Sequence, residues 1–309
     1  MKSRFSVQLV LVLGVLAISG AAILIRKAEA EPIAIAFYRM LFAAVMLLPL
    51  ALHDLTHTKV TWQAVGALAL AGFFLALHFA LWNTSLDYTS VTSSVVLVTT
   101  QPVFVTILGA LLLKEIPTRR AWYGLALALA GSTLIALVGS TGDASRLAGN
   151  AMALAGAVMA AGYFLVGRVA RRTLPIGLYA ASAYAFSALF LLLFALILKQ
   201  PLAGYTKETW WSLVLLALVP TVFGHTSLSW ALKYLPTAMV SVSILGEPLG
   251  ATILAMIVLK EMPVLGEILG SCLILAGIFL IWKFGSTEEV EEDQAGGTIE
   301  TCSETVTPS

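Results

Sequence analysis

The residue best placed for chemistry in this chain is Glu247, which lies in a long apolar stretch directly before Pro248. A carboxylate in hydrocarbon is costly unless it is protonated, paired or hydrated, so an acidic residue in such a place is a candidate functional site. It can bind the amine of a substrate, or it can take up and release a proton. It can also serve packing, by capping backbone groups that Pro248 leaves unpaired. The sequence leaves these interpretations open.

A related position lies 146 residues earlier, where the uncharged Gln101 precedes Pro102. Each proline lacks the N–H that would bond the carbonyl four residues before it, which belongs to Val98 or to Ile244. A membrane helix tolerates this loss where a polar cavity or a neighbour satisfies the freed group. We therefore predict a kink at Pro102 and at Pro248, suited to gating, beside a polar cavity.

Polar side chains extend from these two positions along their helices. Ser94 lies seven residues before Gln101, and Ser243 lies four residues before Glu247. Both spacings place the two side chains on one face of a helix. We predict that these four residues bind substrate at the wall of a central cavity. Polar contacts between helices are the alternative.

Two histidines and two aromatic residues complete the candidate site. His78 and Trp82 share a helical face, and His225 occupies nearly the equivalent place in the second half of the chain. Tyr163 offers a hydroxyl in the middle of another apolar segment. We predict that all four bind substrate. Packing inside a helix bundle is the alternative for each, and a position at the membrane interface is a further alternative for Trp82.

The sequence lacks the motifs of catalysis, nucleotide hydrolysis and metal binding. It contains no Gly-x-x-x-x-Gly-Lys-Ser/Thr phosphate loop and no His-Glu-x-x-His zinc motif. Cys272 and Cys302 have no metal-ligand spacing. We therefore expect no catalytic residue, no metal and no cofactor, which argues against an intramembrane enzyme and against a nucleotide-driven pump.

The elements that carry these residues are membrane-spanning helices. Hydrophobic residues make up 59% of the 309 residues and charged residues only 11%, against roughly 25% charged in soluble domains. A spanning helix needs roughly 20 mostly apolar residues. We predict an all-α polytopic membrane protein, with a retained first helix rather than a cleaved signal peptide. Ten segments qualify: 6–25, 33–52, 62–85, 91–113, 120–139, 149–167, 175–198, 209–231, 237–259 and 264–283.

These segments form two copies of one five-helix unit. At a fixed offset of 146 residues, Pro102 recurs as Pro248 and the turn 114–117 recurs as 260–263, with Lys-Glu-x-Pro in both. Because five is an odd number, the second copy must enter the membrane inverted relative to the first, and substrate then binds where the halves meet. We place the first unit at 6–139, the second at 149–283 and a disordered acidic tail at 285–309.

Basic residues predict the orientation. With the N-terminus inside, cytoplasmic segments hold eleven Lys and Arg residues and outer segments hold six. Because positive charge is enriched on the cytoplasmic side, we expect a plasma-membrane protein with both termini in the cytoplasm. The basic surplus outside the acidic tail then reflects the membrane and not nucleic-acid binding. Arg39, close to the start of the second segment, is expected to reach the outer interface or to form a pair.

On these residues the chain resembles the drug/metabolite transporter superfamily, specifically the EamA-type carriers built from two five-helix repeats. The similarity covers about residues 6 to 283. It implies a central cavity lined by the first, third, fourth, sixth, eighth and ninth helices, and it implies transport of amino acids or other metabolites. The residues that carry it are Gln101-Pro102, Glu247-Pro248, the two Lys-Glu-x-Pro turns, Pro32 with Phe37-Tyr38-Arg39, and Ala231-Leu232-Lys233-Tyr234.

We therefore predict a secondary transporter that moves a small organic solute by alternating access, an amino acid or related compound, with export favoured. Proton coupling stays open, and we expect a monomer or a homodimer in the lipid bilayer. One alternative is an uptake carrier for a nucleotide-like or sugar-like metabolite. Another is a structural or regulatory membrane subunit that transports nothing, but such a scaffold has no need of polar stripes in both repeats.

Overall fold

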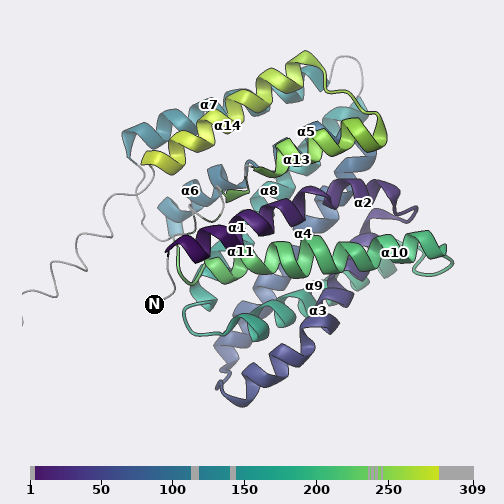
Figure 1. Cartoon of the computed structure of the whole chain (residues 1–309), viewed down its shortest axis with the longest axis vertical. Helices are drawn as coiled ribbons and strands as arrows, with labels where there is room; N and C mark the ends of the chain where they lie inside the picture. Colours follow the sequence, from purple (N-terminus) through teal and green to yellow (C-terminus); the bar gives the residue numbers. More distant parts are fainter. Residues whose placement is uncertain are drawn as a thin grey trace, which may run out of the picture.

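The computed structural model describes residues 4–112, 118–139, 144–235, 237, 240, 243–244 and 246–284. These residues fold into helices, with no strand among them (Figure 1). Three short apolar helices lie within the fifth, ninth and tenth predicted segments: Trp122–Ile135, Gly246–Leu259 and Leu265–Gly277. Within the described part of the chain, seven helices are long and apolar enough to cross a membrane: Leu9–Lys27, Pro32–Thr56, Trp62–Tyr88, Val91–Leu112, Ala144–Ala170, Ile176–Ile197 and Lys207–Ala231. The fold is that of a multi-pass α-helical membrane protein.

Several predicted segments are divided into shorter helices. The first repeat contains α1 (Arg4–Ser19), α2 (Ala21–Lys27), α3 (Pro32–Thr56), α4 (Trp62–Tyr88), α5 (Val91–Val98), α6 (Gln101–Leu112) and α7 (Arg119–Gly139). The second contains α8 (Ala144–Ala170), α9 (Ile176–Ile197), α10 (Lys207–Leu216), the π-helix η1 (Ala217–His225), α11 (Thr226–Ala231), α13 (Gly246–Leu254), the π-helix η2 (Ala255–Leu259) and α14 (Leu265–Phe284). The first and fourth segments are thus interrupted, and the eighth contains a π-helix.

Equivalent helices of the two repeats pack against each other at opposite ends of the molecule. The fifth and tenth helices, α7 and α14, form one pair, and the second and seventh, α3 and α9, form the other. Figure 1 shows α7 and α14 together at one end and α3 and α9 at the other. A pair made of two equivalent helices is what a two-fold relationship between the repeats produces.

Glycines at the contact between α7 and α14 show that the repeats are inverted. A Cβ added at Gly131 would lie 2.6 Å from the carbonyl oxygen of Gly270, and one added at Gly277 would lie 2.5 Å from that of Gly124. Gly131 and Gly277 are equivalent under the 146-residue offset, and so are Gly124 and Gly270. Exchanging the repeats therefore turns the first contact into the second. Along α7 the contact residues run from 124 to 131, and their partners on α14 run in the reverse order, from 277 to 270. The equivalent helices are therefore antiparallel, which confirms the predicted inversion.

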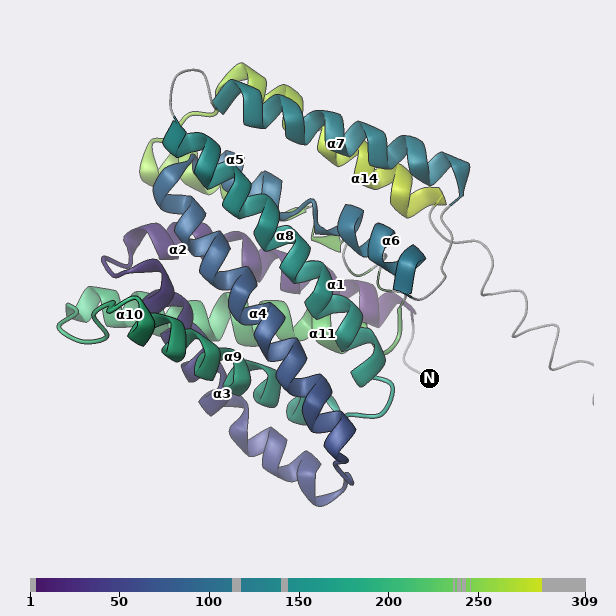
Figure 2. The same ribbon diagram turned by 180° about the vertical axis from the view of Figure 1, so that it is seen from behind.

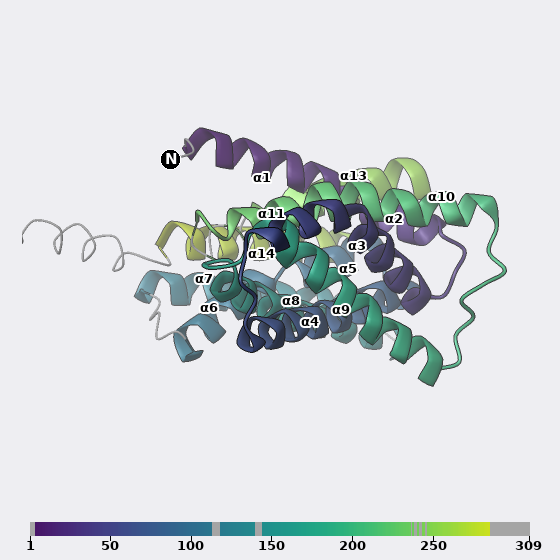
Figure 3. The same ribbon diagram turned by 90° about the horizontal axis from the view of Figure 1, so that it is seen from below.

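The remaining helices fill the centre of the molecule. Here α4 packs on α8, and its repeat-related counterpart is the packing of η1 on α1. Likewise α5 and α6 contact α8, as α13 contacts α1. Figure 2 shows α4 and α8 running side by side on one side of the molecule, and Figure 3 shows α1, α10 and α13 on the opposite side. Residues between these two layers lie at the interface of the repeats.

Two predictions concern residues outside the described part of the chain. The turn at 113–117, which contains the first Lys-Glu-x-Pro motif, is one, and the acidic tail at 285–309 is the other. The predicted turn and the predicted disorder of the tail stay predictions.

Candidate functional site

The fourth helix is broken rather than kinked next to Pro102. Helix α5 ends at Val98, two residues follow, and α6 begins at Gln101. Because Pro102 has no N–H, the helix cannot continue its hydrogen bonding to the carbonyl of Val98. The hydroxyls of Thr99 and Thr100 turn back onto carbonyls of α5, at 2.9 Å from Val95 O and 2.7 Å from Leu97 O respectively. The polar groups at the break are thus partly satisfied within the segment itself.

The second repeat reproduces this arrangement around Pro248. Helix α13 begins at Gly246, so Glu247 stands in its first turn, as Gln101 stands in the first turn of α6. The backbone N–H of Glu247 donates to the carbonyl of Ile244 at 2.8 Å. A negative charge in the first turn is stabilised by the positive end of the helix dipole. The position therefore suits an acidic side chain better than the middle of an unbroken helix would.

A small cavity lies between these two helix starts. The space in it that the centre of a water molecule can occupy is about 20 Å³. A cavity of this size holds about one water. It is lined by His78, Trp82, Val98, Thr99, Gln101, His225, Ile244 and Glu247. The lining includes two pairs related by the 146-residue offset, Val98 with Ile244 and Gln101 with Glu247. The cavity therefore lies on the two-fold relationship between the repeats.

Aromatic rings and histidines form one wall of this cavity. The rings of His78 and Trp82 stack with centroids 6.0 Å apart, and Phe79 meets the ring of His225 edge-on at 5.4 Å. His78 Nδ1 lies 3.0 Å from the carbonyl oxygen of Gly156. Since a carbonyl only accepts, Nδ1 carries the proton in this contact. Trp82 is 1% exposed and buried in the core, so it is not part of an interfacial belt.

Arg39 lies directly behind this wall. Its side chain is fully buried, and the guanidinium carbon lies 4.2 Å from the centroid of the Phe79 ring and 5.9 Å from that of Trp82. The expectation that Arg39 reaches the outer interface is therefore wrong. The long side chain points into the bundle because aromatic faces attract the cation there.

The π-helix η1 provides the hydrogen-bond partner of this arginine. Arg39 Nε donates to Thr221 Oγ1 at 2.6 Å, and Thr221 Oγ1 donates to the carbonyl of Leu216, five residues earlier, at 2.8 Å. Pro220 interrupts the ordinary helical hydrogen bonding just before Thr221. π-Helical segments within α-helices occur often at functional sites. Here Thr221 Oγ1 donates a hydrogen bond to the backbone of its own helix and accepts one from Arg39.

Arg39 and Glu247 bring opposite charges to the site from different repeats. They interact electrostatically, yet no Arg39 nitrogen forms an ion pair within 4.0 Å of a Glu247 oxygen in the described part of the chain. Arg39 Nη1 and Nη2 are buried and have no hydrogen-bond partner. The same holds for Trp82 Nε1, Gln101 Nε2 and His225 Nε2. Unpaired buried polar atoms are costly and rare, and five of them gather here.

The structure brings five of the eight predicted substrate-binding residues to this cavity and leaves three elsewhere. Ser94 is buried, and its hydroxyl lies 2.6 Å from that of Ser85. The hydroxyl of Tyr163 lies 2.8 Å from that of Ser229. Ser243 is half-buried and is not among the lining residues. The predicted role of these three residues has no support from this cavity.

Sequence reasoning did not select Arg39, Phe79 or Thr221 for the site. A signal for Arg39 existed, because it is an arginine inside an apolar segment and its counterpart 146 residues later is the uncharged Ala185. Thr221 follows Pro220, which predicts a disturbed helix. Phe79 carried no signal, since one phenylalanine among many apolar residues looks like core.

Among the described residues, no three His, Cys, Asp or Glu side chains are grouped to hold a metal.

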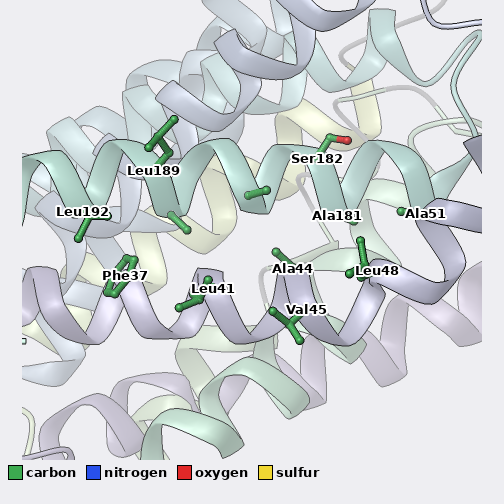
Figure 4. A pocket seen from close by; sticks show the side chains of 12 residues that line it. Phe37, Leu41, Ala44, Val45, Leu48, Ala51, Ala181, Ser182, Leu189 and Leu192 are labelled. Carbon is green, nitrogen blue, oxygen red and sulfur yellow. The ribbon is translucent and has the colours of Figure 1, made fainter. Parts of the chain in front are cut away.

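A larger groove lies between α3 and α9 (Figure 4) and shares no lining residue with this cavity. Its volume is about 490 Å³, and its lining is apolar apart from the hydroxyl of Ser182. Val45, Leu48 and Leu189 in its wall are exposed. Exposed aliphatic side chains on membrane helices are expected to face hydrocarbon. The groove has no charged group to orient a polar solute, so we do not place the transport site there.

Comparison with known proteins agrees with this architecture. The profile of the EamA-like transporter family matches residues 5–137 and again residues 147–283. An "Uncharacterized transporter" of Archaeoglobus fulgidus is 28% identical, over 88% of this chain and 96% of its own. The "Uncharacterized transporter YwfM" of Bacillus subtilis is 26% identical, over 82% and 85%. A chain in a solved crystal structure superposes with a TM-score of 0.67 at 18% identity, over 90% of this chain and 96% of that one, which shows the shared fold.

Proposed function

The chain belongs to the EamA-like transporter family, and on that premise we propose that it is a secondary transporter that exports a small organic metabolite, an amino acid or a related compound, by alternating access. The observation that carries the proposal is the cavity at the interface of the inverted repeats. Its lining includes one carboxylate and the unpaired side-chain nitrogens of Trp82, Gln101 and His225. The guanidinium of Arg39 lies behind the aromatic wall, against Phe79 and Trp82. These groups suit a small polar solute and have no evident use in a scaffold.

The inverted repeats supply the mechanism. Two halves related by a two-fold axis in the membrane plane can exchange conformations, which opens the central site first to one side and then to the other. The cavity has room for about one water, so the site must widen when a solute enters. The break between α5 and α6 and the π-helix η1 border the cavity. Both are places where a helix can bend without losing a full ladder of hydrogen bonds.

Glu247 is the centre of the proposed site. It either holds the amine of the solute or exchanges a proton as the halves rearrange, and both roles need its charge. We expect Glu247→Gln to lower solute flux in proteoliposomes by about tenfold or more, because the loss of one charge at a buried polar site typically costs about 2 kcal/mol or more. Protein abundance should stay near that of the wild type, because the amide keeps the size of the side chain.

Glu208→Gln is the matched control, since Glu208 lies in the first turn of α10 and is exposed. Flux should be measured with a panel of amino acids and related metabolites. Comparison of culture medium from overexpressing and deletion strains then tests the direction of transport. Wild-type flux and an unchanged pH profile in Glu247→Gln would assign Glu247 to helix packing. A wild-type protein that moves no solute would favour the scaffold alternative.

A further inference from the structure

Arg39 has the features of a ligand-binding residue rather than a structural one. It is fully buried, and only Nε has a protein partner. Both terminal nitrogens, Nη1 and Nη2, lack one. A structural arginine normally donates hydrogen bonds to carbonyls or carboxylates. The buried Arg171 does so to the carbonyls of Ser229 and Leu174. Two free, adjacent guanidinium donors form a fork that matches the two oxygens of a carboxylate.

The rest of the site holds this fork in place. The hydrogen bond to Thr221 fixes Nε, and the ring of Phe79 lies against the face of the guanidinium. The fork is therefore oriented before any ligand arrives, which lowers the entropic cost of binding. Glu247 lies near enough to interact electrostatically with Arg39 but does not occupy the fork. The two charges are thus separated instead of neutralising each other directly.

We propose that Arg39 binds the carboxylate of the transported amino acid while Glu247 binds its ammonium group, which makes these two residues the determinants of zwitterion recognition. This inference rests on the proposed transport function. The free donors of Arg39 would bind the acid group of the solute. The carboxylate of Glu247, which forms no ion pair with Arg39, would bind the amine. Arg39 belongs to the first repeat and Glu247 to the second. A zwitterion held by both would therefore connect the two halves that must move relative to each other.

The first test compares solutes on the wild-type protein. Proteoliposomes receive an equimolar mixture of the twenty common L-amino acids or the equimolar mixture of their α-carboxamides, and mass spectrometry identifies what accumulates. An amide keeps the amine and the side chain but cannot accept a guanidinium fork as a carboxylate does. We expect each transported amino acid to move at least about tenfold faster than its amide, because a site built for one polar group rejects analogues that lack it.

The second test compares variants at matched protein yield. Arg39→Gln should lower amino-acid flux about tenfold or more and should bring the acid-to-amide ratio close to one. Arg39→Lys should recover only part of the ratio, because an ammonium keeps the charge but not the planar fork. Arg171→Gln is the control for the loss of a buried arginine. It should keep the acid-to-amide ratio even where it lowers yield.

The outcomes separate this inference from the proposed function. A wild-type protein that carries amides as fast as amino acids overturns the role of Arg39 and leaves transport itself standing. The same holds if a folded Arg39→Gln variant keeps the wild-type ratio. A protein that carries neither mixture overturns the amino-acid substrate class, in both the proposed function and this inference. Because the first test needs no variant, it decides the role of the carboxylate even if Arg39→Gln misfolds.

Discussion

The carboxylate of Glu261 accepts a hydrogen bond from the backbone N–H of Val91 at 2.6 Å, although the two residues lie 170 positions apart and in different repeats. Val91 is the first residue of α5, where backbone N–H groups have no partner within the helix. Next to this contact, Glu267 Oε1 accepts hydrogen bonds from the hydroxyls of Ser90 and Ser93. Glu261, in the turn between η2 and α14, thus caps the first turn of α5 in the other repeat, and Glu267, in the first turn of α14, binds the serine hydroxyls beside it.

We expect this contact to hold one end of the central cavity closed. A hydrogen bond to a charged group contributes about 1.5–3 kcal/mol, which corresponds to about a tenfold or larger change in the open population. In a cysteine-free background, Val98→Cys places a reporter in the cavity wall. Adding Glu261→Ala should make its labelling by a membrane-impermeant maleimide about tenfold faster. Equal labelling rates with and without Glu261→Ala would rule out this closing role, and Glu208→Ala serves as the control.

The glycine contacts between α7 and α14 predict a symmetric pair of packing defects. A methyl group at Gly131 or at Gly277 would overlap the backbone of the facing helix, at 2.6 and 2.5 Å respectively. Overpacking of this type costs about 1–3 kcal/mol, so each alanine variant should lower the melting temperature in detergent, and by similar amounts. Gly66→Ala is the control, because nothing lies within 4 Å of an added Cβ there. If Gly66→Ala is as destabilising as the other two, the close approach is not the cause.

Gln101 and Glu247 line the same cavity, which predicts that a second carboxylate is poorly tolerated. Gln101→Glu would place a further charge in a space that holds about one water. Its desolvation and its repulsion from Glu247 would both be uncompensated. We expect the melting temperature to fall by roughly 5–10 °C, since 1 kcal/mol corresponds to about 2–4 °C in a chain of this size. Gln101→Met removes the amide without adding a charge, so its melting temperature should fall less. Equal melting temperatures for Gln101→Glu and the wild type would show that the cavity hydrates freely.

The orientation in the membrane is a prediction of the charge distribution and of the inverted repeat. Cysteines placed at Lys114 and Lys260 should react with an impermeant reagent from opposite sides of the membrane, with Lys260 on the outside. Labelling of both from one side would contradict the inverted repeat, and labelling of Lys260 from the cytoplasm would contradict this orientation. The same labelling should place both chain termini in the cytoplasm.

The sequence by itself determined the class of fold, the repeat and the two helix interruptions. These features depend on properties that are local or additive along the chain. Hydrophobicity marks the spans, the 146-residue offset relates the two halves, and Pro102 and Pro248 each lack an N–H. The presence of Gln101 and Glu247 in one cavity follows from that repeat, because equivalent residues at the interface of a two-fold arrangement come close to each other.

Only the tertiary structure decided which other side chains share the site. Arg39 meets Thr221 across 182 positions, while Tyr163 and Ser94 turn to other hydroxyls. In a soluble helix the polar face points to water, so periodicity shows which face is inside. A helix in a membrane bundle is apolar on nearly every side, and the hydrophobic pattern does not tell which face meets a neighbour. The rotation of each helix is set by close packing, and that is why the partner of Arg39 could not be derived from its own segment.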